Sequence, residues 1–265
     1  MSRQQAVDLW RRARRLFDIP TSQANEQARE LLEEAIAADE SFGSAHGLLS
    51  YVFIRNRLYG WGNDGDADLA KAQELVDRAL LKEPSDYDNH WSKAILLLHQ
   101  DKVDDAIEAY REVEDRIPKD NEVYPVFLAE SAEAYIRQGQ TKQAIERVGR
   151  AIQLSMGEVP DWFYWNLGYA ILMDGNPGKA KEMLKKVKEQ VGPVLVDMAV
   201  AVALADLPNP GFAAGIDDFA EAKALVQDAM KLDDRITLAG MELQAFPGLE
   251  QRQRYLNTLK RLGLK

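Results

Sequence analysis

The chain has 265 residues, a formal net charge of −10 at pH 7 and no cysteine. Nucleic-acid binding depends on clustered Lys and Arg side chains, so this negative charge disfavours a nucleic acid as the partner. The lack of cysteine excludes disulfides, a thiolate nucleophile and Cys-ligated zinc, and it is typical of a cytoplasmic protein.

Hydrophobic segments are too short or too interrupted for a membrane protein. The first ten residues, MSRQQAVDLW, lack the apolar core of a signal peptide. The longest apolar run, residues 194–207, contains Asp197 and Asp206 and is shorter than a bilayer span. We therefore expect a soluble, cytoplasmic protein with no membrane-spanning helix.

The first predicted hairpin spans residues 3–40 and joins two amphipathic helices through the turn DIPTS. Its first helix contains arginines at positions 11, 12, 14 and 15, a cluster that also suits a nucleic acid or an acidic membrane. The apolar face of the same helix is formed by Trp10, Ala13, Leu16 and Phe17. Because the overall charge is negative, we expect the arginines to face solvent or a partner domain.

The second predicted hairpin, residues 43–84, contains the insertion YGWGNDGD at 59–66. Asp64, Asp66 and Asp68 alternate there as in a calcium-binding loop. The glycine and the glutamate that such a loop requires are replaced by Leu69 and Leu75. We therefore expect Asp66 or Asp68 to cap the following helix instead.

The next two hairpins, residues 86–118 and 124–156, keep the same alternation of apolar helices and turns. We expect the third hairpin to end at Pro118, because a proline disfavours helical geometry in the residue before it. In the fourth hairpin, Gly139 lies where the chain must reverse direction.

The fifth hairpin, residues 160–192, shows the pattern most clearly in PDWFYWNLGYAILMDGNPGKAKEMLKKV. Apolar or small residues recur at steps of three and four, are interrupted by Gly-Asn-Pro, and then resume. This spacing predicts two short helices packed face to face. Gly168 and Ala180 are expected at the contact, because larger side chains there would hold the two backbones apart.

The sixth hairpin, residues 193–232, begins with a very apolar helix that we expect to be buried between its neighbours. Alanines equivalent to Ala180 recur through all six hairpins, at positions 28, 72, 106, 144 and 222. We expect residues 1–232 to form one repeat array. Residues 233–265 are expected to cap it with two helices around a Phe-Pro-Gly turn, because a terminal unit of a stack needs a polar outer face.

The residues Trp, Leu-Gly, Tyr, Ala, a bulky residue and Ala in the fifth hairpin match the tetratricopeptide repeat (TPR) pattern of about 34 residues. The chain therefore resembles TPR proteins. This resemblance implies an all-α fold: a right-handed α-solenoid of about six TPR-like hairpins with a C-terminal pair of capping helices.

A narrower resemblance rests on PDWFYWNLGYAILMDGNPGKA, ARELLEEAIAADESFGSAHGLLSYVF, the Gly-Trp insertion and the ending FPGLEQRQRYLNTLKRLGL. Together they are similar to TPR arrays that follow the catalytic domain of bacterial class III adenylate cyclases or the winged-helix domain of transcriptional activators. Such an array implies an accessory module without catalytic residues. No cyclase or winged-helix segment precedes the array in this sequence, which leaves a standalone relative or a fragment as alternatives.

Residue patterns for catalysis or metal binding are missing. The three histidines, His46, His90 and His99, include no pair spaced i, i+4 on one helix. The sequence has no phosphate-binding loop, nucleophile elbow or dinucleotide-binding turn. We therefore expect no enzymatic activity, no metal site and no cofactor.

A partner-binding groove is expected on the first helices of the hairpins, because these helices line the concave face of a TPR stack. The repeat register predicts which first-helix residues do not pack within a hairpin and therefore face the groove. They are Tyr51, Arg55, Trp91, Ile95, His99, Glu133, Arg137, Trp162, Trp165 and Tyr169. Arg and large aromatic side chains are frequent interface anchors, and we place Arg137, Trp165 and Tyr169 at the centre. The alternative is that Trp91 and Trp165 pack between adjacent first helices.

Two functional hypotheses follow. In the first, the protein is a non-catalytic scaffold that binds a peptide or a helical segment of another protein in this groove. In the alternative, it is a regulatory or sensor module of a signalling protein, separated from its effector domain.

Overall fold

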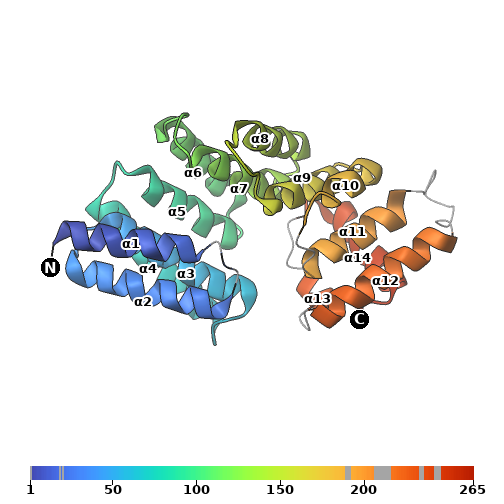
Figure 1. Cartoon of the computed structure of the whole chain (residues 1–265), viewed down its shortest axis with the longest axis horizontal. Helices are drawn as coiled ribbons and strands as arrows, with labels where there is room; N and C mark the ends of the chain where they lie inside the picture. The colour runs from blue at the N-terminus through green and yellow to red at the C-terminus, as the bar shows by residue number, and fades with distance from the viewer. Residues whose placement is uncertain are drawn as a thin grey trace. The chain divides into compact units, whose positions relative to one another are not determined.

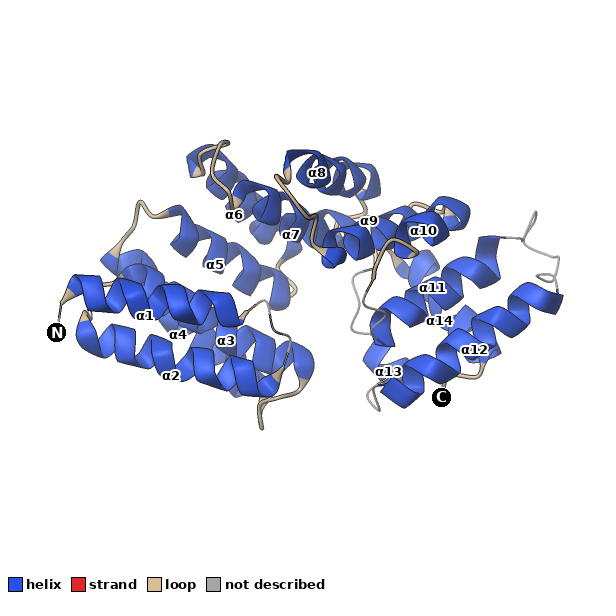
Figure 2. Cartoon of the chain, viewed as in Figure 1, coloured by secondary structure: helices blue, strands red, loops and turns tan. Residues whose placement is uncertain are grey.

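A computed structural model describes residues 2–17, 19, 21–188, 192–205, 216–232, 236–241 and 246–265. Within these residues every regular element is an α-helix (Figure 2). Consecutive helices pack against each other in pairs, as expected for an α-solenoid of helical hairpins. The predicted all-α fold class is therefore confirmed.

The chain forms two compact units, and the first is Met1–Ile117. In Figure 1 it runs from blue to green. Its helices are α1 (Arg3–Leu16), α2 (Ser22–Ala38), α3 (Gly43–Tyr59), α4 (Gly65–Lys82), α5 (Tyr87–His99) and α6 (Val103–Arg116). They pack as the pairs α1/α2, α3/α4 and α5/α6, and α3 also packs against α2 and α5.

The second unit is Pro118–Lys265. Its helices are α7 (Tyr124–Arg137), α8 (Thr141–Leu154), α9 (Asp161–Met173), α10 (Pro177–Leu184), α11 (Gly192–Ala205), α12 (Ile216–Leu232), α13 (Leu238–Met241) and α14 (Leu249–Leu262). Helices α7/α8, α9/α10 and α11/α12 form pairs, and α14 packs against α11, α12 and α13. The division into a repeat array, 1–232, and a cap, 233–265, stays a prediction.

Small residues lie where the two helices of a hairpin meet. The six equivalent alanines, at positions 28, 72, 106, 144, 180 and 222, are all 0% exposed. A Cβ atom added to Gly168 on α9 would lie 2.7 Å from Cγ of Leu184 on α10. The repeat register inferred from the sequence therefore identifies the contacts that hold the hairpins together.

Turn residues explain how a hairpin reverses. Gly139, between α7 and α8, and Gly175, between α9 and α10, have φ angles of 81° and 84°. Glycine adopts this left-handed conformation without the steric cost that a side chain adds. Asn176 then starts α10, because its side-chain oxygen accepts a hydrogen bond from the backbone N–H of Lys179.

The insertion in the first unit is shorter than predicted, because α3 continues to Tyr59 and α4 already begins at Gly65. The expected capping by Asp66 or Asp68 is wrong. Asp64 is the cap: its Oδ1 accepts from the backbone N–H groups of Asp66, at 3.0 Å, and of Ala67, at 3.1 Å. Asp64 has the extended backbone that an N-cap requires, whereas Asp66 and Asp68 lie in the first helical turn, where the helix dipole favours negative charge.

The most apolar helix, α11, is buried as expected. Its described side chains from Val194 to Ala203 are at most 7% exposed, Asp197 among them. In the described part of the chain, no helix is both long and apolar enough to cross a membrane.

Candidate partner-binding surfaces

On α7, the predicted groove residues Glu133 and Arg137 form an ion pair. They are one helical turn apart, and Nη2 of Arg137 lies 2.8 Å from Oε1 of Glu133. The arginine side chain is 16% exposed and the glutamate side chain 38% exposed. This pair therefore offers a partner both a carboxylate and a positioned guanidinium that is still in contact with solvent.

On α9, Trp165 binds a buried carboxylate that the sequence analysis did not assign to the site. Its indole Nε1–H donates to Oδ2 of Asp197 on α11 at 2.7 Å. The hydroxyl of Tyr255 on α14 donates to Oδ1 of the same carboxylate. These three residues link α9, α11 and the C-terminal helix.

The Asp197 carboxyl is only 1% exposed, and this burial raises its pKa to about 7, although the hydrogen bonds from Trp165 and Tyr255 favour the charged form. Two donors aimed at one carboxyl satisfy both of its oxygens, as a buried polar group requires. The sequence indicates this cluster only through Asp197, a single charged residue within the otherwise apolar stretch of α11.

Tyr169, one turn after Trp165 on α9, contacts the C-terminal segment. Its ring meets the ring of Tyr255 edge-on, with 6.5 Å between centroids. Burial, and then the charges of Asp197 and Glu133, raise the pKa of Tyr169 well above its usual value. The ring of Phe246 lies 5.4 Å from that of Tyr255 on the same segment. Part of the predicted groove surface of this unit thus already contacts a helix.

Trp162, the remaining predicted residue of α9, lies near the start of the helix. It is partly exposed and meets the ring of its neighbour Phe163 edge-on at 4.4 Å. Trp162 therefore adds aromatic surface one turn before Trp165.

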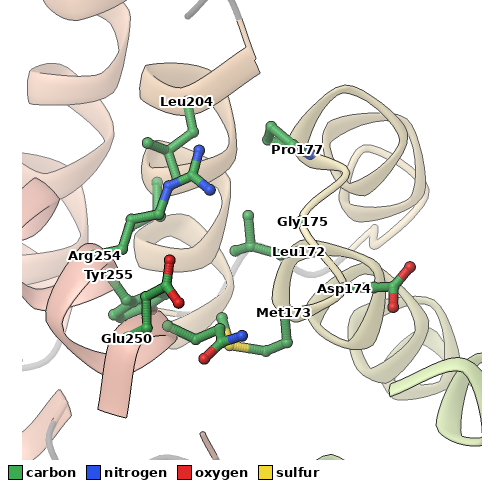
Figure 3. Close-up of a pocket in the computed structure, with 11 residues that line it drawn as sticks. Leu172, Met173, Asp174, Gly175, Pro177, Leu204, Glu250, Arg254 and Tyr255 are labelled. Carbon is green, nitrogen blue, oxygen red and sulfur yellow. The ribbon is translucent and has the colours of Figure 1, made fainter. Parts of the chain in front are cut away.

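A small pocket opens beside α14 (Figure 3). Its walls are formed by the end of α9, the turn that leads into α10, helix α11 and helix α14; the lining residues are Leu172, Met173, Asp174, Gly175, Pro177, Val200, Leu204, Glu250, Gln251, Arg254 and Tyr255. Its volume is about 110 Å³, below the roughly 300 to 1,000 Å³ of small-molecule sites. This pocket fits one side chain of a partner better than a cofactor.

In the first unit, Arg55 lies inside an aromatic enclosure. Its guanidinium carbon is 5.1 Å from the ring centre of Phe17, 5.7 Å from that of Tyr59 and 5.5 Å from that of Trp61. Tyr51 joins this cluster through a ring contact of 5.3 Å with Phe17. Arg55 is 4% exposed, so it is not the open groove side chain that the register suggests.

The predicted residues of α5 differ among themselves. Trp91 and Ile95 are 6% and 7% exposed and belong to the core, as the alternative interpretation of Trp91 proposed. His99, at the end of the helix, is partly exposed. The structure therefore brings together Tyr51 with Arg55, Glu133 with Arg137, and Trp165 with Tyr169, and it buries Trp91.

The arginine-rich helix α1 uses several of its cations within the first unit: Arg3 pairs with Asp39 and Glu83, Arg11 pairs with Asp8, and Arg14 pairs with Asp88 on α5. Nη1 of Arg14 lies 3.6 Å from Oδ2 of Asp88 on α5. Burial raises the pKa of Asp88 to about 6, and the nearby Arg14 acts in the opposite direction. Elsewhere in the described residues, no three His, Asp or Glu side chains gather in a way that could hold a metal ion.

Comparisons with known proteins support the repeat pattern. A family model described as "Tetratricopeptide repeat" matches residues 65–121. The chain is also similar to the structure of Pseudomonas aeruginosa pilF, at 14% identity and a TM-score of 0.54, over 96% of this chain and 98% of that chain. No curated protein sequence matches it.

Two further solved structures share the fold. A tetratricopeptide repeat protein from Parabacteroides merdae ATCC 43184 has 14% identity and a TM-score of 0.52, over 98% of this chain and 92% of that chain. The chain is also similar to a chain in the structure of the APC/C hetero-tetramer Cut9-Hcn1, with a TM-score of 0.58 at 14% identity, over 86% of this chain and 46% of that chain. At such identities the likeness concerns the fold.

Proposed function

We propose that this chain, whose residues 65–121 match a tetratricopeptide repeat model, is a non-catalytic scaffold that binds a peptide or helical segment of another protein. TPR arrays present the first helices of their hairpins as an extended surface, and nothing in the residue patterns of this chain points to chemistry at that surface. We place the protein in the cytoplasm, in keeping with its lack of cysteine.

One observation carries the proposal. The first-helix surface around α9 already contacts a helical segment, because Tyr255 of α14 packs against Tyr169 and shares the carboxylate of Asp197 with Trp165. Such a combination of aromatic area with a few oriented polar groups is typical of helix-binding surfaces. The neighbouring Glu133 and Arg137 extend this surface with charged groups that remain in contact with solvent.

The candidate residues are those selected from the repeat register. In the second unit they are Glu133, Arg137, Trp162, Trp165 and Tyr169. In the first unit they are Tyr51, Arg55, Trp91 and His99, of which Arg55 and Trp91 are buried in this structure. Binding at these two requires neighbouring side chains to move, which is common at protein interfaces.

Affinity capture from a native lysate tests the proposal. Wild-type protein and Arg137→Ala are immobilised in parallel, and bound proteins are identified. A partner that wild type retains and Arg137→Ala releases supports the scaffold. Turnover of a small molecule by the purified chain, with no protein retained, would contradict it. If the partner is a nucleotide cyclase or a DNA-binding activator, the regulatory alternative is favoured.

A further inference from the structure

A buried cation in the first unit has no anionic partner among the described residues. Arg55 is 4% exposed. Within the described residues its one hydrogen bond goes from Nη1 to the backbone oxygen of Phe17 at 3.4 Å, and three aromatic rings lie within 6 Å of its guanidinium carbon. A guanidinium carries five N–H donors, so most of these donors have no acceptor among the described side chains and backbone groups.

Burial of a charge is unfavourable unless another group offsets the lost hydration. The faces of Phe17, Tyr59 and Trp61 do so in part through cation–π attraction. An aromatic face attracts the charge but accepts no strong hydrogen bond. The guanidinium therefore remains able to bind a planar anion through two parallel N–H bonds.

Two of these rings lie where α3 ends: Tyr59 is its last residue, and Trp61 is in the loop that leads to α4. Tyr59 and Trp61 stack with 4.6 Å between ring centres. The backbone N–H of Trp61 donates to the oxygen of Asn56 at 3.0 Å, and Asn56 accepts through its side chain from Asn25 on α2 at 2.8 Å. The loop is thus fixed at one point and covers Arg55 with aromatic side chains.

Exposed apolar side chains surround this position. Ile19 in the α1–α2 turn is 48% exposed, and Leu58 and Tyr59 at the end of α3 are 44% and 39% exposed. Ile19 lies two residues after Phe17, whose ring contacts Arg55, and Leu58 precedes Tyr59, whose ring also contacts Arg55. Asp64, in the loop that follows Trp61, uses its carboxylate to cap α4. Arginine with exposed apolar area is a frequent composition of binding sites.

We propose that Phe17, Arg55, Tyr59 and Trp61, here called the Arg55 cage, bind a carboxylate of a peptide segment that carries an aromatic or apolar side chain next to that carboxylate. The carboxylate accepts two N–H bonds from Arg55 in place of the Phe17 carbonyl. The adjacent apolar group contacts Tyr59 and Ile19. This assignment rests on the proposed scaffold function and specifies the partner chemistry at one place on it.

Entry of the carboxylate requires only a local change. Tyr59, at 39% exposed, is the most exposed ring of the cage, and in the proposed complex its side chain turns aside to admit the carboxylate. A Cβ atom added to Gly60, which follows it, would meet no atom within 4 Å, so the loop borders open space there. Such side-chain rearrangements are common when partners bind.

The test uses two matched probes on the full chain. N-acetyl-phenylalanine presents a carboxylate beside an aromatic ring, and N-acetyl-phenylalaninamide presents the same ring without the charge. We expect the acid to shift the Nε–Hε NMR signal of Arg55 in a saturable manner, and the amide to bind at least about tenfold more weakly, as loss of a charge-assisted pair predicts. Equal binding of the two probes, or no shift with either, would overturn the proposal.

Variants localise the effect. Arg55→Gln is expected to lose at least about tenfold in affinity for the acid, because the bidentate donor is removed. Arg57→Gln changes an exposed arginine two residues away and should alter that affinity less than twofold. Unchanged affinity in Arg55→Gln would contradict the cage. If Arg55→Gln does not fold, as judged by circular dichroism, the two-probe comparison on wild type decides.

These outcomes are separate from those for the scaffold as a whole. A protein partner that depends on Arg137, together with a failed probe experiment, would leave the scaffold function standing and remove the cage. If the acid probe binds but no protein partner is retained, the Arg55 cage stands as a carboxylate site and the scaffold function is removed.

Discussion

At the residue scale, small side chains determine how closely the helices of a hairpin approach. Gly168 faces Leu184, and Ala180 on the same second helix is 0% exposed. These positions follow from sequence spacing alone, because a close helix contact leaves no volume for a larger side chain. Their partners in space, such as Leu184, are equally predictable since they lie in the same hairpin.

The first prediction concerns Gly168. Gly168→Leu should lower the free energy of unfolding by roughly 1 to 3 kcal/mol, because the new side chain must enter the space of Leu184. Glu182→Ala, at an exposed position on α10, should change it by less than about 0.5 kcal/mol. Urea unfolding of both variants provides the measurement. Equal midpoints for the two would show that the α9–α10 contact is not as described.

The second prediction concerns the pH dependence that Asp197 creates. Its pKa is raised from 3.8 to about 7 by burial, so the folded state binds a proton more tightly than the unfolded state. The resulting stabilisation is complete below pH 3.8 and is lost as the pH rises through about 7. Between these values one group changes stability by up to about 1.4 kcal/mol per pH unit.

Comparison with Asp197→Asn isolates this contribution, because Asp88, with a pKa of about 6, adds a dependence of the same sign in the first unit. We expect the stability difference, wild type minus Asp197→Asn, to fall between pH 5 and 7 and to level off above pH 8. Urea midpoints at each pH measure it. A difference independent of pH would contradict a raised pKa at Asp197.

At the element scale, α14 is the least predictable helix in its placement. Its existence follows from the amphipathic sequence LEQRQRYLNTLKRL, which buries Tyr255 and Leu259 on one side. Its docking depends on Asp197, 58 residues earlier, which the sequence presents only as an interruption of an apolar run. Likewise, the covering of Arg55 by rings from α1 and the insertion depends on tertiary contacts that helical spacing does not encode.

The third prediction tests how α14 is held. Tyr255→Phe removes the hydroxyl that donates to Asp197 and should cost roughly 1 to 3 kcal/mol. The amide hydrogens of α14 should then exchange faster than in wild type. Tyr164→Phe is the matched control, because the Tyr164 ring contacts Lys186 and its hydroxyl donates no hydrogen bond within the described part of the chain. Equal exchange rates of α14 in both variants would show that the hydroxyl does not hold the helix.

At the scale of the whole molecule, the fold is built by repeating the same helix–helix contact in successive hairpins, whereas the surface that would bind a partner differs from one hairpin to the next. Contacts within hairpins recur through the chain, so the all-α fold and the buried alanines were predictable from periodicity. The surface was less predictable. Periodicity places a residue on a helix face, but it does not tell whether a neighbouring segment covers that face, as happens at Trp91 and Arg55.

The central claim, that the first-helix surface binds another protein, is tested most directly by the affinity of Arg137→Ala for the captured partner. The Arg137 side chain is 16% exposed and pairs with Glu133 on its own helix. We expect Kd to increase at least about thirtyfold, corresponding to a loss of about 2 kcal/mol at an anchor. Lys185→Ala, at an exposed position after α10, should leave Kd within about twofold of wild type. Equal affinities for both variants and wild type, with unchanged circular dichroism spectra, would contradict the account.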